Sequence, residues 1–363
     1  MSLLTPIQVG PMLLPNRFMR SATNELTAKS GNAPTESQDK IYSKLAKGKV
    51  GLIVPGYLFV GRGSKRNNSL NTIDKANKWK KTIDSVHKEG SKIMLQIYHD
   101  GEINGVRYLP SRVFPFYSAL TIPQIEEIID DFIKAGVYAY KAGADGVQLH
   151  AAHGFLLSMF LSPFTNRRND KYSGSPEARV RIIKEIVDGI KKATSDSFSI
   201  GIKLNGSDNL GIFGVRSKLC SKYVNLLNGI DLFEISCGFL NPFSTIRAKP
   251  PKYNLTGVFR KIINPWGFHE AYNQKNAEYI KKKNPDKIIA SVGGYRTFKS
   301  MEDEIKNHKF DIVSISRPFV RQPNLVLQYQ KGLIKQVDCK SCNQCFYNLY
   351  THPEKDIIKC TYP

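Results

Sequence analysis

Two histidines, His150 and His153, stand three residues apart at the end of an apolar run that begins at Gly146. Imidazole groups in such a place donate hydrogen bonds to a substrate oxygen on which negative charge develops. The same pair also suits two hydrogen-bonded core histidines or half of a metal site, although no acidic third ligand is spaced nearby as zinc would require. We therefore interpret His150 and His153 as candidate catalytic residues and keep the other two interpretations open.

Gln96 and Lys203 are polar residues within two other apolar runs. A buried glutamine must find hydrogen-bond partners, and its amide offers the donor and the acceptor that a pyrimidine-like edge requires. A buried lysine is costly unless it is paired with an anion, and a flavin ring that becomes anionic on reduction is one such partner. Gln96 could instead lie at the core rim, and Lys203 could face the helical layer and extend outward. Strand alternation does not decide this without the register.

Glycines and an arginine follow the last two apolar runs in a pattern typical of phosphate binding. Gly293 and Gly294 allow backbone N–H groups to approach an anion, while Ser316 and Arg317 add a hydroxyl and a fork of donors. The loops after strands seven and eight usually hold phosphate in an α/β barrel. No G-x-G-x-x-G motif follows a strand, so the sequence does not predict a Rossmann fold.

Eight short apolar runs alternate with helical segments along the chain. Thr121 and Gln124 form a capping-box pattern before one helix, and Ser175 with Pro176 begins another. A doubly wound sheet would alternate too, but the unusual residues lie at the C-terminal ends of nearly all runs, which a barrel brings together. We predict an α/β fold, a single (β/α)8 TIM barrel over residues 1–335, with a cysteine-containing tail at 336–363 packed on the barrel or extending it. The predicted strands are Phe18–Thr23, Val50–Val54, Lys92–Tyr98, Gly146–His150, Ser199–Leu204, Ile230–Ile235, Lys287–Val292 and Asp311–Ile315, with longer loops near 100–120 and 237–270.

The composition of the 363 residues indicates a globular protein with a sizeable core, since 41% are hydrophobic. No secretory signal and no apolar stretch of membrane-spanning length is visible, so we expect a soluble, cytoplasmic protein. The net charge of +22 suggests attraction to anionic partners. No basic run is interleaved with aromatic residues as single-strand binders require, so nucleic acid is not the expected partner. The oligomeric state, with a homo-oligomer among the options, is left open.

Four of the six cysteines crowd the C-terminus. In a reducing compartment such a cluster indicates metal binding or reduced thiols rather than disulfides. Cys220 and Cys237 stand alone and are expected to be small buried side chains. The four candidate metal ligands are Cys339, Cys342, Cys345 and Cys360.

Taken together, several motifs resemble those of the old yellow enzyme family of NADH:flavin oxidoreductases and ene-reductases. The similarity extends from about Leu4 to about Pro323, and the stretch around the two histidines is its most specific part. The motifs that carry it are Asn16–Thr23, Gly51–Val54, Gln96–Gly101, His150-x-x-His153 with Phe160–Pro163, and Asn166–Ser175.

The resemblance implies a tightly bound FMN across the barrel mouth, reduced by NADH or NADPH. Hydride then passes from flavin N5 to a small-molecule acceptor: an activated alkene such as an α,β-unsaturated carbonyl, a quinone or a nitro compound. The resemblance further implies that His150 and His153 bind the acceptor's oxygen, that Gln96 bonds the pyrimidine edge, and that Lys203 replaces the usual arginine beside N1. Ser21, Ala22, Thr23 and Tyr57 would approach the ring, and Gly293, Gly294, Ser316 and Arg317 would hold the phosphate.

Two departures from the family pattern bear on the chemistry. Phe155 stands where the family has its proton-donating tyrosine, so protonation at Cα must come from another tyrosine, from water, or not occur. General acid catalysis is worth about 10²–10⁴-fold, so the substitution can disfavour alkene reduction and make quinones, nitro compounds or O2, which need no such donor, plausible acceptors. Ser316 replaces a glycine and adds a hydroxyl near the phosphate. The cysteine tail resembles the iron–sulfur region of the 2,4-dienoyl-CoA reductase branch, so a [4Fe-4S] cluster, zinc and reduced thiols are all considered.

Two other functions fit part of the sequence. A flavin barrel that modifies RNA, like a dihydrouridine synthase, would use the basic surface, but such enzymes rely on a catalytic cysteine in the mouth and an added RNA-binding domain. The second is a non-catalytic FMN-binding protein.

Overall fold

The computed structural model describes residues 2–25, 33–64, 68–112, 118–239, 270–345 and 358–362. All eight predicted runs form strands, and these are parallel and closed into a barrel: neighbours pair in the order β10, β11, β12, β13, β14, β3, β4 and β6, and β6 pairs with β10. The predicted (β/α)8 barrel is therefore confirmed. The strands are β3 (Phe18–Arg20), β4 (Leu52–Ile53), β6 (Lys92–Tyr98), β10 (Gly146–Ala151), β11 (Ser199–Ser207), β12 (Leu232–Cys237), β13 (Ile289–Val292) and β14 (Ile312–Ile315).

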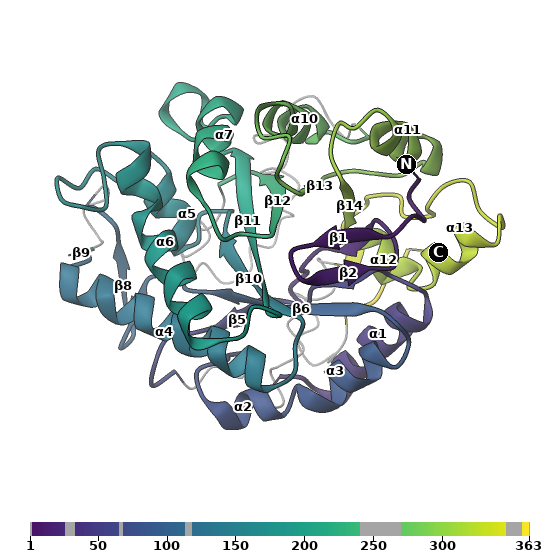
Figure 1. Cartoon of the computed structure of the whole chain (residues 1–363), viewed down its shortest axis with the longest axis horizontal. Helices are drawn as coiled ribbons and strands as arrows, with labels where there is room; N and C mark the ends of the chain where they lie inside the picture. The colour runs from purple at the N-terminus through teal and green to yellow at the C-terminus, as the bar shows by residue number, and fades with distance from the viewer. Residues whose placement is uncertain are drawn as a thin grey trace.

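Helices between the strands surround the barrel wall (Figure 1). Thr121 and Gln124 form the predicted capping box of α4, and the Ser175 hydroxyl caps α6. None of the described helices has both the length and the apolar content that a bilayer span requires. The helices are α1 (Glu36–Lys47), α2 (Ile73–Asn77), α3 (Lys80–His87), α4 (Ile122–Lys141), α5 (Leu156–Leu161), α6 (Pro176–Ala193), α7 (Ser217–Leu226), α10 (Gln274–Lys283), α11 (Phe298–Lys306), α12 (Arg317–Arg321) and α13 (Leu325–Gln330), with a short 3-10 helix at Gly211–Phe213.

An N-terminal hairpin covers the end of the barrel at which the strands begin. Its antiparallel strands are β1 (Ile7–Val9) and β2 (Met12–Leu14). Ser199 Oγ, at the start of β11, donates to the Val9 carbonyl at 3.3 Å. The apolar side chains of the hairpin pack with the first interior layer of the barrel, which includes Met19, Leu52, Met94, Leu232, Ala290 and Ile312. The opposite end, where the strands finish, is therefore the mouth.

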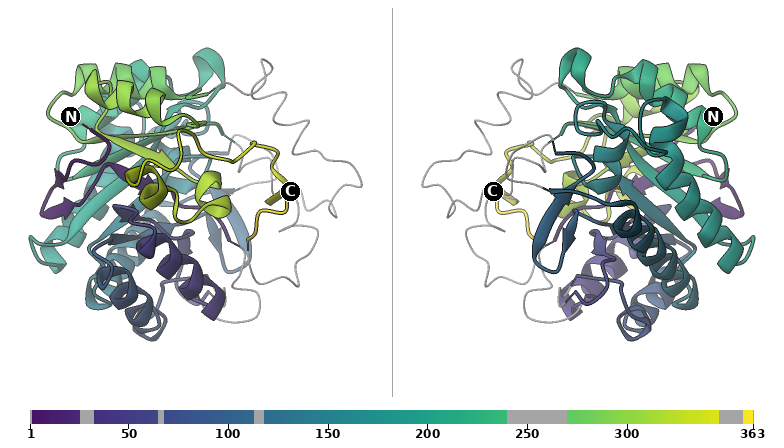
Figure 2. Two further views of the ribbon diagram at one scale, coloured as in Figure 1. Left: turned by 90° about the vertical axis from the view of Figure 1, so that its right-hand side faces the viewer. Right: turned by 90° about the vertical axis from the view of Figure 1, so that its left-hand side faces the viewer.

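Short strands flank the mouth. β5 (Leu58–Phe59) pairs with the end of β6, while β7 (Glu102–Ile103), β8 (Val106–Leu109) and β9 (Ser118–Ala119) pair with one another. The segment near 100–120, predicted as a long loop, thus contains short strands. The loop predicted near 237–270 lies mostly outside the described residues. Figure 2 shows the β7–β8 hairpin and the C-terminal tail projecting on the same side of the molecule.

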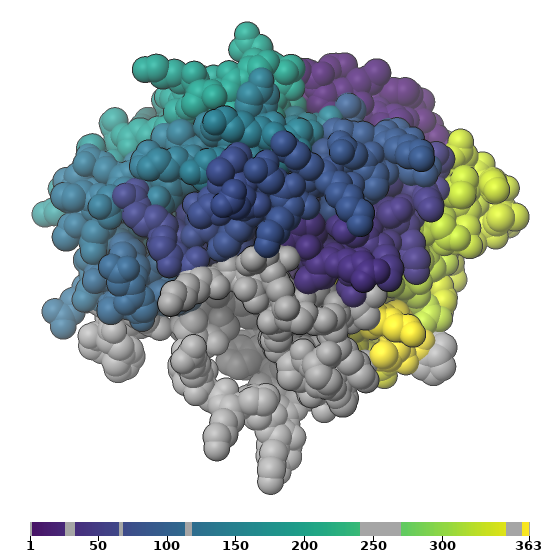
Figure 3. Space-filling model, turned by 90° about the horizontal axis from the view of Figure 1, so that it is seen from below, coloured from purple at the N-terminus to yellow at the C-terminus, as the bar shows by residue number. Residues whose placement is uncertain are grey.

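The described part of the C-terminal tail packs on the barrel. Thr297 forms an antiparallel bridge with Gln336. Cys345 and Ile358 are buried together, with Ile41 of α1 and Val320 of α12 packed against them. Figure 3 accordingly shows the last described atoms near the edge of the α1 segment.

Candidate active site

Side chains from the strands fill the barrel in layers, because alternate residues of each strand point inward. Above the apolar layer that contacts the hairpin lies a polar layer in which every side chain is buried. Most of its members stand two residues beyond a member of the apolar layer on the same strand. We call this set the interior polar layer, and it consists of Ser21, Gln96, Gln148, Lys203, Glu234 and Ser314.

Lys203 points into the barrel. Its Nζ donates to Ser21 Oγ at 2.7 Å and lies 3.2 Å from Glu234 Oε1. In the strand register Lys203 pairs with Glu234 on β12 and with His150 on β10. The alternative of a lysine extending outward through the helical layer is therefore wrong, and Glu234 is the anion that a buried ammonium group requires.

Gln96 lies beside Gln148 in the same layer. Gln96 Nε2 donates to Gln148 Oε1 at 2.6 Å, and Gln148 Nε2 donates to Glu234 Oε2 at 3.0 Å. Gln96 Oε1 is buried and has no hydrogen-bond partner. A buried amide oxygen of this kind is unusual in a folded protein and suits a ligand that brings an N–H group, such as the pyrimidine edge of a flavin.

The two histidine rings are neighbours at the end of β10, in an edge-to-face arrangement with ring centroids 5.2 Å apart and planes at 83°. His153 has a positive φ of 61°, its Nε2 lies 2.7 Å from Ser236 Oγ, and its backbone N–H donates to Asn205 Oδ1 at 3.2 Å. Burial lowers the pKa of His150 well below its usual value, with His153 and Lys203 adding to the effect. Burial and Lys203 lower the pKa of His153 to about 3. Both imidazoles are thus neutral near pH 7.

Aromatic side chains surround His150 at the mouth. The Phe155 ring lies 4.4 Å from the His150 ring and 5.2 Å from the Tyr57 ring, and Tyr98 lies 4.6 Å from Tyr57. Asn24 Nδ2 donates to the Tyr57 hydroxyl at 2.7 Å. Tyr57 is thus placed beside the histidines, whereas Phe155, which cannot donate a proton, is the ring that contacts His150 most closely in this group.

The residues predicted to bind phosphate follow the neighbouring strands β13 and β14. Gly293 has a φ of 148° and Gly294 a φ of 81°, and a Cβ at Gly293 would lie 2.9 Å from Asn273 Cβ. Only glycine suits such a backbone, which leaves its amide approachable by an anion. Thr23 Oγ1, from the end of β3, lies 2.7 Å from Ser316 Oγ. Of the other two residues predicted near the ring, Ser21 is buried and Ala22 is half-buried at the same strand end.

Arginines at this end of the barrel contact the C-terminal tail. The Arg317 guanidinium donates to Asn343 Oδ1, and that of Arg296 donates to Ser341 Oγ. One edge of the Arg317 guanidinium is therefore in contact with the tail.

The tail cysteines do not form a metal site in this structure. Within the described ranges, no three His, Cys, Asp or Glu side chains are grouped to hold a metal ion. Instead, Arg321 Nη1 lies 3.5 Å from Cys360 Sγ, and Cys345 is buried with Ile358. The arrangement does not fit zinc or an iron–sulfur cluster, so metal binding stays a prediction without structural support. Cys220 is buried as predicted, whereas Cys237 is only half-buried.

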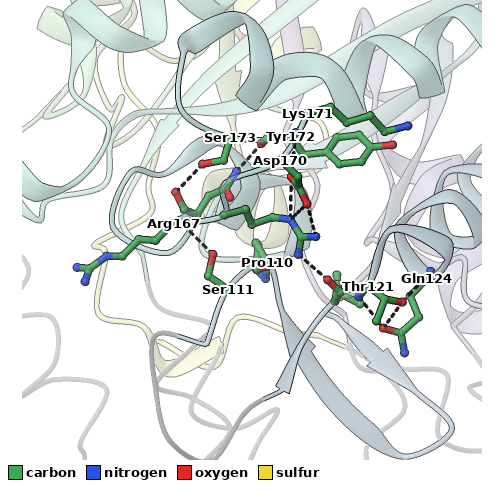
Figure 4. A network of polar contacts seen from close by, with 12 residues as sticks. Pro110, Ser111, Thr121, Gln124, Arg167, Asp170, Lys171, Tyr172 and Ser173 are labelled. Carbon is green, nitrogen blue, oxygen red and sulfur yellow. Dashed lines mark hydrogen bonds and ion pairs between the residues drawn. The ribbon is translucent and has the colours of Figure 1, made fainter.

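The motif after the histidines is a structural clamp (Figure 4). Arg168 donates through Nε to Asp170 at 2.9 Å, and through Nη1 to the Pro110 and Leu120 carbonyls at 2.6 and 2.5 Å. Asp170 also accepts from the Tyr172 backbone N–H at 3.1 Å. This motif therefore joins the loop after β10 to the segment that carries β8 and β9, and it does not reach the histidines.

Several residues that support the candidate site were not singled out from the sequence, among them Gln148, Asn205, Glu234 and Ser236. Glu234 had a usable signal, because an acidic residue inside the apolar run at 230–235 needs a buried partner. Gln148 had the same signal in its run. Ser236 and Asn205 have no such signal in the sequence, because small polar residues at strand ends are common.

The fold is a (β/α)8 barrel, and buried side chains that form hydrogen bonds lie at its mouth. The chain belongs to the NADH:flavin oxidoreductase / NADH oxidase family, whose model matches residues 2–336. The resemblance to old yellow enzymes is thereby confirmed, and the protein is a flavin-dependent oxidoreductase.

Relatives of known activity support this assignment. The chain is 26% identical to 4,4'-dithiodibutanoate disulfide reductase from Rhodococcus erythropolis, over 96% of this chain and 93% of the relative. It is 27% identical to NADH oxidase from Thermoanaerobacter brockii over 93% of this chain, which spans 52% of that enzyme. Among solved structures, 2-naphthoyl-CoA reductase has a TM-score of 0.80 at 24% identity, covering 98% of this chain and 56% of that one. Morphinone reductase has a TM-score of 0.72 at 22% identity, covering 94% and 93%.

The residues present fit FMN. Gln96 Oε1 is buried without a hydrogen-bond partner, Lys203 supplies a positive charge inside the barrel, and Gly293 and Gly294 have the positive φ angles at which backbone N–H groups can be approached by an anion. Ser21, Ala22 and Thr23 directly follow β3, and Tyr57 directly precedes β5 at the same mouth.

Proposed function

We propose that this chain binds FMN across the barrel mouth and transfers hydride from NADH or NADPH to an electron-poor small molecule. When bound, the flavin supplies a site that accepts a hydride and releases it. The observation that carries the proposal is that the neutral His150 and His153 rings are neighbours at the end of β10, with His150 beside Lys203 of the buried layer in the strand register. Neutral imidazole N–H groups are suited to polarise an acceptor's oxygen without repelling Lys203.

The acceptor class follows from the groups around His150. A quinone or a nitro compound takes up electrons and then exchanges protons with water. Its reduction therefore needs no side chain that protonates a carbon atom. An activated alkene must be protonated at Cα, and Phe155 cannot do this. Reduction of a disulfide, the activity in the name of the Rhodococcus relative, likewise needs no protonation at carbon. We therefore propose quinones, nitro compounds and disulfides as better acceptors than alkenes.

The proposal is tested by anaerobic titration of the FMN-loaded protein with NADH and with NADPH, followed by addition of each acceptor. We expect the flavin absorption to bleach with a nicotinamide donor and to return with a quinone, a nitroarene or 4,4'-dithiodibutanoate faster than with an α,β-unsaturated ketone. His153→Asn should keep its FMN content but lose acceptor turnover. A purified protein that takes up no FMN would contradict the proposal. A flavin that binds but is not bleached would favour a non-catalytic FMN-binding protein.

A further inference from the structure

Glu234 is the centre of the interior polar layer. It is fully buried on β12, and its carboxylate accepts hydrogen bonds from side chains on four other strand segments. Oε1 accepts from Ser21 at 2.6 Å, from Ser314 at 2.8 Å and from Lys203 at 3.2 Å. Oε2 accepts from Gln148 at 3.0 Å. Oε1 thus accepts three hydrogen bonds and Oε2 accepts one, so both oxygens of this carboxylate are bonded to donors within the barrel.

A carboxylate in this place has a substantial desolvation cost. An apolar side chain of similar volume would be tolerated at least as well for stability alone. Within the interior polar layer, Glu234 and Lys203 are the two charged members and their charges cancel. The pair therefore leaves the floor of the mouth with a positive group close to a negative one, rather than with an isolated ammonium.

The carboxylate also determines how two amides are oriented. Because an ionised carboxylate only accepts, Gln148 must direct its Nε2 toward Glu234, and its Oε1 then faces Gln96. Gln96 in turn donates through Nε2, which leaves Gln96 Oε1 as the acceptor without a partner. The charge on Glu234 therefore determines, through Gln148, that Gln96 presents a hydrogen-bond acceptor and not a donor to the ligand.

We propose that Glu234 is a positioning residue that lowers the reduction potential of the bound flavin by balancing the charge of Lys203, and that fixes Gln96 as a hydrogen-bond acceptor. The proposal rests on the proposed function, in that FMN occupies the mouth. Lys203 favours the anionic reduced flavin, and Glu234 opposes it. Removal of the carboxylate leaves Lys203 uncompensated, so the reduced flavin is bound more tightly relative to the oxidised form.

The test is the midpoint potential of FMN bound to the full chain and to matched variants. Glu234→Gln is expected to raise the ratio of affinities for reduced and oxidised FMN by about tenfold or more, which is about 30 mV upward for a two-electron couple. Lys203→Met should shift the potential downward, and the double variant, which has neither charge, should return toward the wild type. Asp145→Asn is the control, because Asp145 pairs with Lys92 at the opposite end of the strands, and its potential should equal that of the wild type.

A second measurement reports on the amides. Because a neutral side chain at 234 allows both glutamines to turn over, Glu234→Gln is also expected to weaken the binding of oxidised FMN several-fold, as measured by fluorescence quenching. If the single variant Glu234→Gln does not fold, the effect of the Glu234 charge is measured by comparing Lys203→Met with the double variant. The double variant should then have the higher midpoint potential. An unchanged or lower potential in Glu234→Gln, with FMN bound to the wild type, overturns this inference alone. A wild-type protein that binds no FMN overturns the proposed function with it.

Discussion

His153 Nε2 lies 2.7 Å from Ser236 Oγ, although the two residues are 83 positions apart in the chain. His153 is in the loop after β10, whereas Ser236 is near the end of β12. The backbone of His153 is held from the other side by Asn205 of β11. Three consecutive strands of the barrel thus determine where this imidazole points, and a neutral ring with one nitrogen bonded to a hydroxyl has the other nitrogen available.

We expect Ser236→Ala to lower kcat/KM for the acceptor by about three- to tenfold, because one neutral hydrogen bond is worth about 0.5–1.5 kcal/mol. FMN affinity should not change, since Ser236 does not belong to the interior polar layer. Steady-state kinetics with a quinone and a fluorescence titration with FMN give the two values. Ser199→Ala, at the start of β11, is the matched control. Equal losses in both variants would show that Ser236 has no role specific to His153.

Phe155→Tyr is expected to increase alkene reduction by about 100-fold, the lower limit for general acid catalysis, and to leave quinone reduction unchanged. The reason is that the Phe155 ring lies 4.4 Å from His150, so a hydroxyl there would enter the mouth beside the acceptor. Rates with an α,β-unsaturated ketone and with a quinone measure the two effects. Phe59→Tyr is the control, because Phe59 lies on the far side of Tyr98. A variant that gains nothing with the ketone would mean that proton supply does not limit alkene reduction.

Much of the fold was predictable because its signals are local. The strand at Lys92–Tyr98 and the capping box at Thr121 are in the structure as predicted, since β-branched runs and cap residues act within a few positions. The first strand is shorter than predicted and ends at Arg20. Just beyond it, Ser21 still donates its backbone N–H to the Ile315 carbonyl, while its hydroxyl donates to Glu234.

The candidate site was only partly predictable because it depends on barrel closure. His150, Gln96 and Lys203 could be selected from their sequence context. The direction in which Lys203 points follows from its register with Glu234, which is set by strands far apart in the chain. The surroundings of the tail cysteines depend on arginines of the barrel, and no local pattern reveals such a contact.

Stability should fall as the pH is lowered, and the two histidines should contribute strongly. Burial lowers both pKa values, that of His153 to about 3, so the unfolded chain takes up protons below its pKa of 6.5 while the folded chain does not. From pH 7 to pH 5 His153 should therefore cost about 2 kcal/mol of unfolding free energy, and His150 acts in the same direction. Urea unfolding at both pH values checks this, with His153→Asn expected to lose about 2 kcal/mol less than the wild type. Equal pH dependence of the two proteins would contradict a neutral, buried His153.

Arg317→Ala should weaken FMN binding by about 10- to 100-fold, because a hydrogen bond to a charged group is worth about 1.5–3 kcal/mol. Asn343→Ala should have a smaller effect of about two- to fivefold, since Asn343 only holds the guanidinium in place. Riboflavin, which has no phosphate, should bind equally to all three proteins. Arg321→Ala is the control on the same helix, because Arg321 contacts Asp338 and the Tyr362 carbonyl in the tail. If Arg321→Ala weakened FMN binding as much as Arg317→Ala, the arginines would act by holding the tail and not the phosphate.

Arg168→Lys should destabilise the protein by about 1.5–3 kcal/mol even though the charge is kept. A lysine cannot reproduce the fork that bonds Asp170 and two backbone carbonyls at once. The neighbouring Arg167 provides a matched control, since its side chain extends away from this network in Figure 4 and Arg167→Lys should change stability by less than about 0.5 kcal/mol. Chemical unfolding of both variants gives the comparison. Because the clamp does not contact the histidines, kcat for folded Arg168→Lys should remain near the wild-type value at low temperature. A variant of normal stability but low kcat would instead place Arg168 in the reaction.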